Sequence, residues 1–156
     1  MSKEHHHLLE SISQGTELCI KGNVYRPIAK VIYVALSSPD KIYGKVFFDD
    51  HEVLVICPDD RYICFGKDLG NIGNDLPGKS TITYLDKTFQ LVVNDYQIVV
   101  SIEFGDPIHI EGEVNYWDYE SVDDPTRTIS LGTIQRTGER ADVMGDILSL
   151  KDLVLG

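Results

Sequence analysis

The chain has 156 residues, of which 42% are hydrophobic and 25% charged, a composition typical of a globular protein with one domain or two small ones. Its formal net charge is −11, and because affinity for nucleic acids and for anionic membrane surfaces comes from Lys and Arg, both are disfavoured as partners. No apolar run approaches the roughly 18 residues of a membrane-spanning helix, so direct membrane insertion is not expected and a cytoplasmic location is predicted.

Residues 1–14 are predicted to be an N-terminal tail or a short helix, with any helix confined to Glu4–Ser13. Three consecutive histidines at positions 5–7 lie in this tail, where a solvated run is more typical than a metal site. The three cysteines, at positions 19, 57 and 64, are odd in number and form no CxxC pair. They favour core thiols in a reducing compartment over disulfides or zinc, so neither a metal nor a cofactor is predicted.

Residues 15–66 have the turn spacing of an antiparallel meander and are predicted to be a first β repeat. Gly22-Asn23 is interpreted as the turn of a hairpin between Leu18–Lys21 and Val24–Leu36. Further strands are predicted at Ile42–Phe48, Val53–Cys57 and Tyr62–Phe65. The glycine-rich stretch 67–80 then serves as a linker, because it lacks the Lys-Ser/Thr pair of a phosphate-binding loop.

Residues 81–134 are predicted to be a second β repeat, followed by a C-terminal segment at 135–156 that includes a possible short helix at Ser149–Leu155. Two-residue turns are expected at Asp86-Lys87 and Asn94-Asp95, and a three-residue loop at Gly105-Asp106-Pro107. These registers place seven apolar residues in one core: Phe89, Leu91, Ile98, Val100, Ile102, Ile110 and Val114.

The two repeats align with each other at an offset of 64 to 68 residues, which predicts two structurally similar halves. The predicted fold class is all-β or β-rich, with two tandem antiparallel meanders that form a sandwich or barrel-like core and with short terminal helices. The matched positions are Leu18–Tyr25 with Ile82–Phe89, Gly44 with Gly112, and Gly66 with Gly132.

One face of the predicted strand Ile108–Tyr119 carries acidic and aromatic side chains outside the predicted core. Carboxylates beside an indole and a phenol suit a cationic ligand, through ion pairs and cation–π contacts. The alternative is that Trp117 changes sides at a bulge or is covered by another part of the chain. The predicted ligand or partner surface consists of Glu103, His109, Glu111, Glu113, Trp117 and Tyr119.

Two short motifs carry a family resemblance. The run Gly15–Tyr25 has an opening glycine, a short strand and Gly-x-x-Tyr, and a later Gly-Glu-x-x-x-x-Asp-Tyr element is matched by Gly112, Glu113, Asp118 and Tyr119. Both resemble the bacterial family called domain of unknown function 4178, over roughly residues 12–152. The resemblance implies no catalytic residues. It implies a cytoplasmic accessory protein, because such genes are often found near phage-shock-type membrane-stress proteins and polyamine-synthesis enzymes.

No group of nucleophile, base and orienting residue stands out in the sequence, so no catalytic residue is assigned and the protein is predicted not to be an enzyme. The predicted function is a cytoplasmic, β-rich binding or scaffold module that acts with another protein, as an accessory to a membrane-stress or polyamine-linked system. The alternative is a sensor or binder of a small organic cation, such as a polyamine, through the acidic and aromatic surface.

Overall fold

The computed structural model describes residues 3–36, 42–56, 63–105 and 112–155, and these residues form a β-rich structure, as the sequence predicts. Nine strands belong to one antiparallel sheet. In chain order they are β3 (Ala29–Ala35), β4 (Ile42–Phe47), β5 (Glu52–Ile56), β6 (Ile63–Gly70), β7 (Thr81–Tyr84), β8 (Lys87–Phe104), β9 (Gly112–Ser121), β10 (Arg127–Ile134) and β11 (Asp142–Leu148).

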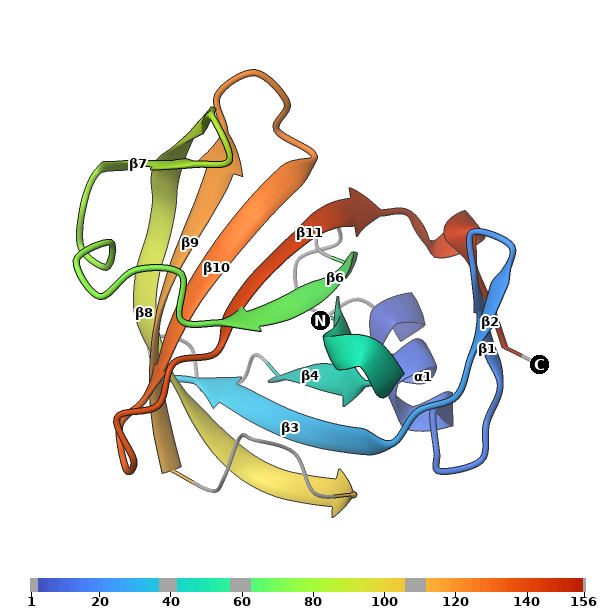
Figure 1. The fold of residues 1–156 in the computed structure, drawn as a ribbon. Coiled ribbons are helices and arrows are strands. Elements are labelled where there is room, and N and C mark those ends of the chain that lie inside the picture. Colours follow the sequence, from blue (N-terminus) through green and yellow to red (C-terminus); the bar gives the residue numbers. More distant parts are fainter. Residues whose placement is uncertain (1–2, 37–41, 57–62, 106–111, 156) are drawn as a thin grey trace.

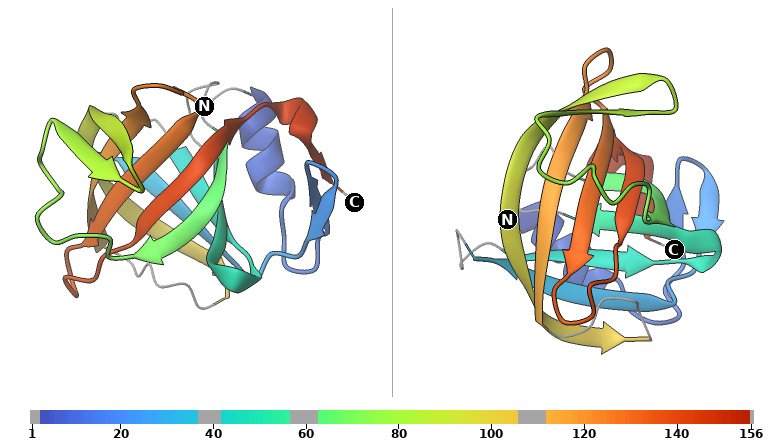
Figure 2. Two further views of the ribbon diagram at one scale, coloured as in Figure 1. Left: turned by 45° about the horizontal axis from the view of Figure 1, so that its top comes forward. Right: turned by 60° about the vertical axis from the view of Figure 1, so that its left-hand side comes forward.

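The large sheet closes on itself. Its strands follow the order β3-β4-β5-β6-β11-β10-β9-β8, and β3 also pairs with β8, so eight antiparallel strands form a closed barrel (Figures 1 and 2). The long strand β8 makes this possible, because it pairs with β9 through Phe89–Val99 and with β3 through Gln97–Phe104. β7 pairs with the start of β8 as a hairpin. Alternate residues of each barrel strand therefore face the lumen and the outside.

One side of the barrel is covered by helix α1 (Lys3–Ser11) and a small sheet of β1 (Leu18–Ile20), β2 (Asn23–Tyr25) and β12 (Leu153–Leu155) (Figure 2). Gly44 on β4 lets the helix approach, because a Cβ there would collide with the side chain of Leu9. We call the apolar residues between this cover and the barrel the helix-side core: Leu8, Leu9, Ile12, Leu18, Ile20, Val46, Phe48, Leu54, Ile56, Ile63, Leu148 and Leu153.

A second cover is the segment 71–80, which follows β6 and lies over the outer face of β9 and β10. We call the apolar residues beneath it and β7 the linker-side core: Ile82, Phe89, Tyr119, Ile129 and Leu131. A buried ion pair anchors the segment, with Nη2 of Arg140 at 2.7 Å from Oδ2 of Asp142. The Ile72 amide donates to the same oxygen at 3.0 Å, and Arg140 Nη1 donates to the Gly73 carbonyl at 3.1 Å. Of the predicted linker 67–80, residues 67–70 thus belong to β6 and residues 71–80 form this anchored cover.

The hairpin turns differ from the predicted ones by one residue. The first lies at Lys21-Gly22 and the second at Leu85-Asp86, and all four residues have positive φ (48°, 85°, 48° and 63°). Two positive φ values in succession define a type I′ turn, which matches the twist of the flanking strands. Ile82 therefore pairs with Phe89, and not with Leu91 as predicted.

The predicted turn at Asn94-Asp95 is wrong, because β8 continues through it without interruption. The Gly105 loop continues outside the described residues, but the pairing beyond it is shifted by one residue, with Ile98 opposite Glu113 instead of Val114.

The predicted core is confirmed in part. Phe89 and Val114 are buried and Leu91 is partly buried, whereas Ile102 is 37% exposed and its predicted place in the core is wrong. The pairing of β8 with β3 shifts register at two β-bulges, and each bulge changes which residues face inward. The alternation of the sequence does not reveal these bulges. Ile110 lies outside the described residues, as do the side chains of Ile98 and Val100.

The predicted internal repeat is not confirmed. Gly44 lies on β4 and Gly66 on β6, with β5 between them, whereas Gly112 and Gly132 lie on the adjacent strands β9 and β10. The segment with Leu18 belongs to the small sheet, while its predicted counterpart with Ile82 belongs to the barrel sheet. Both halves contribute strands to one barrel.

The terminal elements are close to the predicted ones at the N-terminus only. α1 overlaps the predicted helix at Glu4–Ser13, but the C-terminal stretch forms a short 3-10 turn (Leu150–Asp152) followed by β12. A second 3-10 turn (Asp49–His51) joins β4 to β5. None of the helices within the described residues has the length and apolar character needed to cross a bilayer.

Candidate functional site

The lumen of the barrel has an apolar part that is filled by side chains. Its residues come from strands on opposite sides of the barrel and contact one another across it: Val31, Tyr33, Tyr43, Val114 and Ile134. The hydroxyls of Tyr43 on β4 and Tyr116 on β9 are hydrogen-bonded at 3.2 Å, although these strands are not neighbours. This contact identifies the face that carries Tyr43 and Tyr116 as the inner face of the barrel.

Next to this apolar part the inner face becomes polar. Asp118 follows Tyr116 on the inner face of β9, and Ser130 lies opposite it on β10. The Ser130 hydroxyl donates to Asp118 Oδ1 at 2.6 Å. Burial raises the pKa of Asp118 above its ordinary value, while the Ser130 hydrogen bond and the positive charge of Lys45 oppose the shift. Asp118 as a residue is only partly buried, so this region of the inner face is not fully sealed from solvent.

Lys45 is the amine of this region. It lies on the inner face of β4 between Tyr43 and Phe47, and its Nζ is 5.3 Å from the ring centroid of Tyr33, a cation–π distance. Lys45 is buried. Its positive charge acts to lower the pKa of Asp118 and that of the Cys64 thiol, against the effect of burial. Part of the lumen thus already accommodates an ammonium group beside an aromatic ring.

Carboxylates outnumber amines on this inner face. Asp95 pairs with Tyr116 across β8 and β9, and Glu120 follows Asp118 two residues later on the same face. Burial, the hydrogen bond to Tyr43 and the negative charges of Asp118 and Asp95 together raise the pKa of Tyr116 well above its ordinary value. Asp68 on β6 likewise adds to the raised pKa of Tyr33, after burial. Among the described inner-face residues, four carboxylates therefore accompany the single lysine.

Cys64 lines the same region from β6. Its Sγ is 3.4 Å from the Thr128 hydroxyl, and burial raises the pKa of the thiol to about 11, with the negative charges of Asp118 and Asp146 adding to the shift. A thiol with this pKa is protonated at neutral pH, and the thiolate is the nucleophilic form. Cys64 thus acts as a weakly polar lining group. Cys19 is a partly exposed free thiol on β1, and Cys57 lies outside the described residues.

The predicted acidic and aromatic surface is not assembled on the outside of β9. Tyr119 is fully buried in the linker-side core, so its predicted exposure is wrong. Its hydroxyl donates to the backbone carbonyls of Lys79 at 2.7 Å and Leu76 at 3.4 Å. Trp117 is partly buried and contacts the same core. The cause is the segment 71–80, which covers this face, and β9 has no bulge in its pairing with β10.

The other predicted surface residues are separated from these two aromatic side chains. Glu103 and Glu113 are exposed, and His109 and Glu111 lie outside the described residues. In the histidine run, His5 is buried against the barrel while His6 is paired with Glu10 at 2.6 Å (Nε2 to Oε1). In the described parts of the chain, no three His, Cys, Asp or Glu side chains are grouped as a metal site would require.

Sequence reasoning missed the lumen. A signal was present, because Lys45 interrupts an otherwise apolar and aromatic strand, and Asp118 lies in the middle of a strand rich in aromatic residues. A charged residue on the same face as buried neighbours indicates an enclosed polar site. Without the knowledge that the sheet closes, nothing in the sequence marks the inner face as an enclosed site.

The site and the fold together define a closed antiparallel β-barrel with a polar, acid-lined lumen. Comparisons with protein-family models, with curated proteins and with solved structures found no match. The resemblance to the domain of unknown function 4178 family stays a prediction.

Proposed function

We propose that this protein is a non-enzymatic binding protein that takes a small organic cation, such as an amine group of a polyamine, into the polar part of its lumen. The observation that carries the proposal is the excess of carboxylates beside tyrosine side chains on one enclosed inner face, with Asp118 partly accessible to solvent. Carboxylates attract an ammonium group and tyrosine rings add cation–π contact, and both are stronger away from bulk water. The interior of an eight-stranded barrel is either filled by side chains or holds one small ligand.

The position of Lys45 supports the same chemistry. Its ammonium lies over Tyr33 and lowers the pKa of Asp118, as a bound amine would. Lys45 therefore competes with an external cation for the same negative field. If the ligand is a cation, removal of this internal charge strengthens binding, and if the ligand is an anion it weakens binding.

The wider setting of the proposal agrees with this ligand class. The resemblance to the domain of unknown function 4178 family implies a polyamine-linked or membrane-stress context, and the net charge of −11 attracts polyamines at long range. A cytoplasmic location, where polyamines are abundant, is part of the proposal.

Isothermal titration calorimetry with spermidine and putrescine tests the proposal, at two salt concentrations because charge attraction is screened. Asp118→Asn is expected to weaken binding about tenfold or more, as loss of one enclosed ion pair does. Lys45→Met is expected to tighten it. Glu113→Gln is the matched control, because it removes a carboxylate from an exposed position of the same strand and should leave affinity unchanged.

Equal losses in Asp118→Asn and Glu113→Gln would show that polyamines bind the acidic surface in general, and the lumen proposal would then be wrong. Weaker binding in Lys45→Met, together with binding of organic anions, would reverse the ligand class. Each variant is first compared with the parent by circular dichroism and thermal melting, so that loss of fold is separated from loss of binding.

A separate structural observation supports the scaffold function that is predicted from the sequence. β8 pairs with β7 up to Gln90 and with β3 from Gln97, so among the described residues the backbone of 92–95 has a strand partner only on the β9 side. Val92, Val93 and Tyr96 are exposed there. An open stretch of this kind accepts an extended strand of a partner protein. Tyr96→Lys should abolish such an association, while Leu85→Lys, at an exposed turn, should not.

A further inference from the structure

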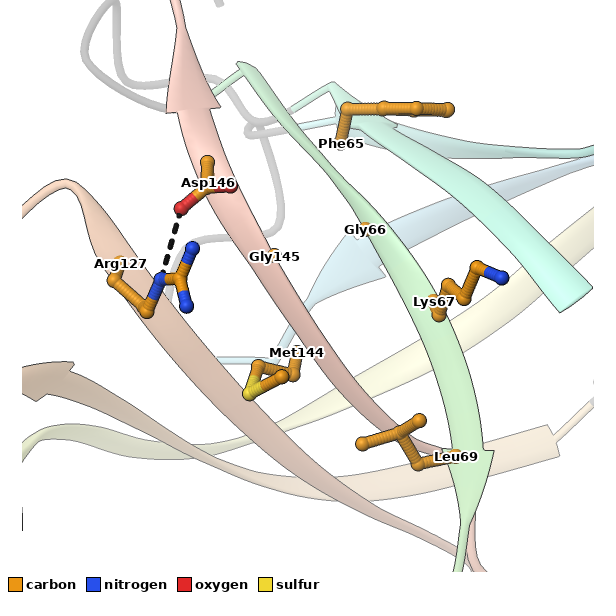
Figure 3. A pocket seen from close by; sticks show the side chains of 8 residues that line it. All are labelled: Phe65, Gly66, Lys67, Leu69, Arg127, Met144, Gly145 and Asp146. Carbon is orange, nitrogen blue, oxygen red and sulfur yellow. Dashed lines mark hydrogen bonds and ion pairs between the residues drawn. The ribbon is translucent and has the colours of Figure 1, made fainter. Parts of the chain in front are cut away.

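A groove lies on the outer face of the barrel, at the seam between the helix-side core and the linker-side core (Figure 3). Its volume is about 170 Å³, and residues of β6, β10 and β11 line it. Neither cover extends over this part of the sheet, so the groove is open to solvent. The lining residues are Phe65, Gly66, Lys67, Leu69, Arg127, Met144, Gly145 and Asp146.

The floor of the groove is bare backbone. Gly66 on β6 and Gly145 on β11 pair directly with each other. A Cβ on Gly66 would collide with the carbonyl of Met144, and one on Gly145 would lie 2.6 Å from the carbonyl of Phe65, so the close approach of the two strands requires glycine at both positions. The Cβ positions of both glycines face the lumen, as the Cys64 side chain does, so on the outer face the two strands present only peptide backbone between the flanking side chains, a surface that suits the face of a planar ring.

The walls of the groove are apolar and fixed in place. Phe65 stands at one end and packs edge-on against Tyr25 and Phe48, with ring centroids 5.0 Å and 6.0 Å away. Met144 and Leu69 stand toward the other end, and Met144 packs against the linker-side core. The volume is well below the roughly 300 Å³ of a drug-sized pocket. The ligand is therefore limited to one or two fused rings.

The rim of the groove carries Arg127, whose ion pair leaves further N–H donors for a ligand. Arg127 contacts Asp146 through Nε at 3.2 Å, and both side chains are nearly half exposed (48% and 45%). Figure 3 shows the two terminal guanidinium nitrogens of Arg127 on the side turned toward the strand that carries Gly145 and Asp146. Such a pair of nitrogens binds a carboxylate in a bidentate manner. Lys67 lies on the opposite flank, so the rim has a local excess of positive charge in an otherwise acidic chain.

We propose that this groove binds a planar aromatic carboxylate, with the ring on the Gly66–Gly145 floor and the carboxylate on the terminal nitrogens of Arg127. Asp146 competes with the ligand for the guanidinium, because both are carboxylates. The site is independent of the lumen: the two lie on opposite faces of the same strands and select opposite charges. Failure of one proposal therefore leaves the other standing.

The chain contains two methionines, Met1 and Met144, which makes the test direct. Protein labelled with ¹³C at the methionine methyl groups is titrated with indole-3-acetate and, separately, with uncharged indole-3-acetamide. We expect saturable movement of the Met144 methyl resonance with the carboxylate and about tenfold weaker binding of the amide.

Three variants sharpen the outcome. Arg127→Gln is expected to weaken indole-3-acetate binding about tenfold, and Asp146→Asn is expected to strengthen it. Arg26→Gln is the matched control, because it also removes an arginine from an exposed ion pair, with Glu17 at 2.8 Å, next to the small sheet. Unchanged Met144 shifts at millimolar indole-3-acetate, equal affinity for acid and amide, or equal losses in Arg127→Gln and Arg26→Gln would each overturn the proposal. Spermidine, as the lumen probe, should leave the Met144 resonance in place.

Discussion

The ion pair that holds the segment 71–80 in place gives the sharpest stability prediction. Arg140 contacts Asp142 with two nitrogens, Nη2 to Oδ2 at 2.7 Å and Nε to Oδ1 at 3.1 Å. The two side chains are 8% and 0% exposed. In Arg140→Met, Asp142 keeps its hydrogen bonds from the amides of Ile72 and Gly132 but loses its only cation among the described residues, at a site without solvent.

Removal of one partner of a buried pair typically destabilises a protein by about 3–5 kcal/mol, because an uncompensated charge stays buried. Against a total stability of roughly 5–15 kcal/mol, this loss is large. The Gly73 carbonyl also loses its donor, which adds to the effect. Arg127→Met is the control, since an exposed pair contributes about 0–1 kcal/mol. Guanidinium denaturation followed by circular dichroism measures both.

The loss should depend on pH. Burial raises the pKa of Asp142 in the folded protein, and Arg140 and the two amides oppose that shift. Between the ordinary pKa and the raised one, the folded state binds more protons than the unfolded state, so stability falls as pH rises. Without Arg140 the pKa of Asp142 in the folded protein rises further, so the pH range over which stability falls becomes wider. The deficit of Arg140→Met should therefore be largest near neutral pH and shrink in acid. A deficit equal to that of Arg127→Met, or one that grows in acid, would refute this account of the pair.

Two further predictions concern burial. Because burial raises the pKa of Cys64 to about 11, only about one Cys64 thiol in a thousand is ionised at pH 8. Alkylation followed by mass spectrometry should therefore label Cys19 well before Cys64. Equal labelling rates would contradict the enclosure of Cys64. Phe89→Ala should destabilise the barrel by about 3–5 kcal/mol, whereas Ile102→Asp, at a residue that is 37% exposed, should be much milder in thermal melts; the reverse order would restore the alternation assumed from sequence.

Local chemistry let the sequence predict most strands, because turn residues and period-two alternation are short-range signals. The strands at Ile42–Phe47 and Glu52–Ile56 agree with the predicted ones within a residue, and the burial of Phe89 and Val114 is confirmed. The turn at Asn94-Asp95 failed for a long-range reason. Asn and Asp favour turns, but β8 pairs with β9 on one side and then with β3 on the other, and this pairing overrides the local preference.

The candidate site was beyond sequence reasoning for the same reason. The alternation of β9 correctly places Glu113, Trp117 and Tyr119 on one face, but it does not say which face is covered. The cover comes from residues about 40 positions away, where Tyr119 donates to Lys79. Asp118, on the other face, comes near Lys45 of β4 only when the sheet closes. Which face of a strand is inside the barrel depends on how the sheet closes and not on the sequence of that strand alone.

The closure between β3 and β8 also bears on how the chain folds. Ala35 pairs with Gln97, so this closure of the barrel joins strands more than 60 residues apart in the sequence. Loop closure over such a length adds modestly to the entropic cost but greatly slows the search for native contacts. Until that step, β3 and the second half of β8 are open edges, which are the parts of a sheet that pair with other chains. We therefore expect folding over milliseconds to seconds, with aggregation competing most strongly at high concentration before the barrel closes.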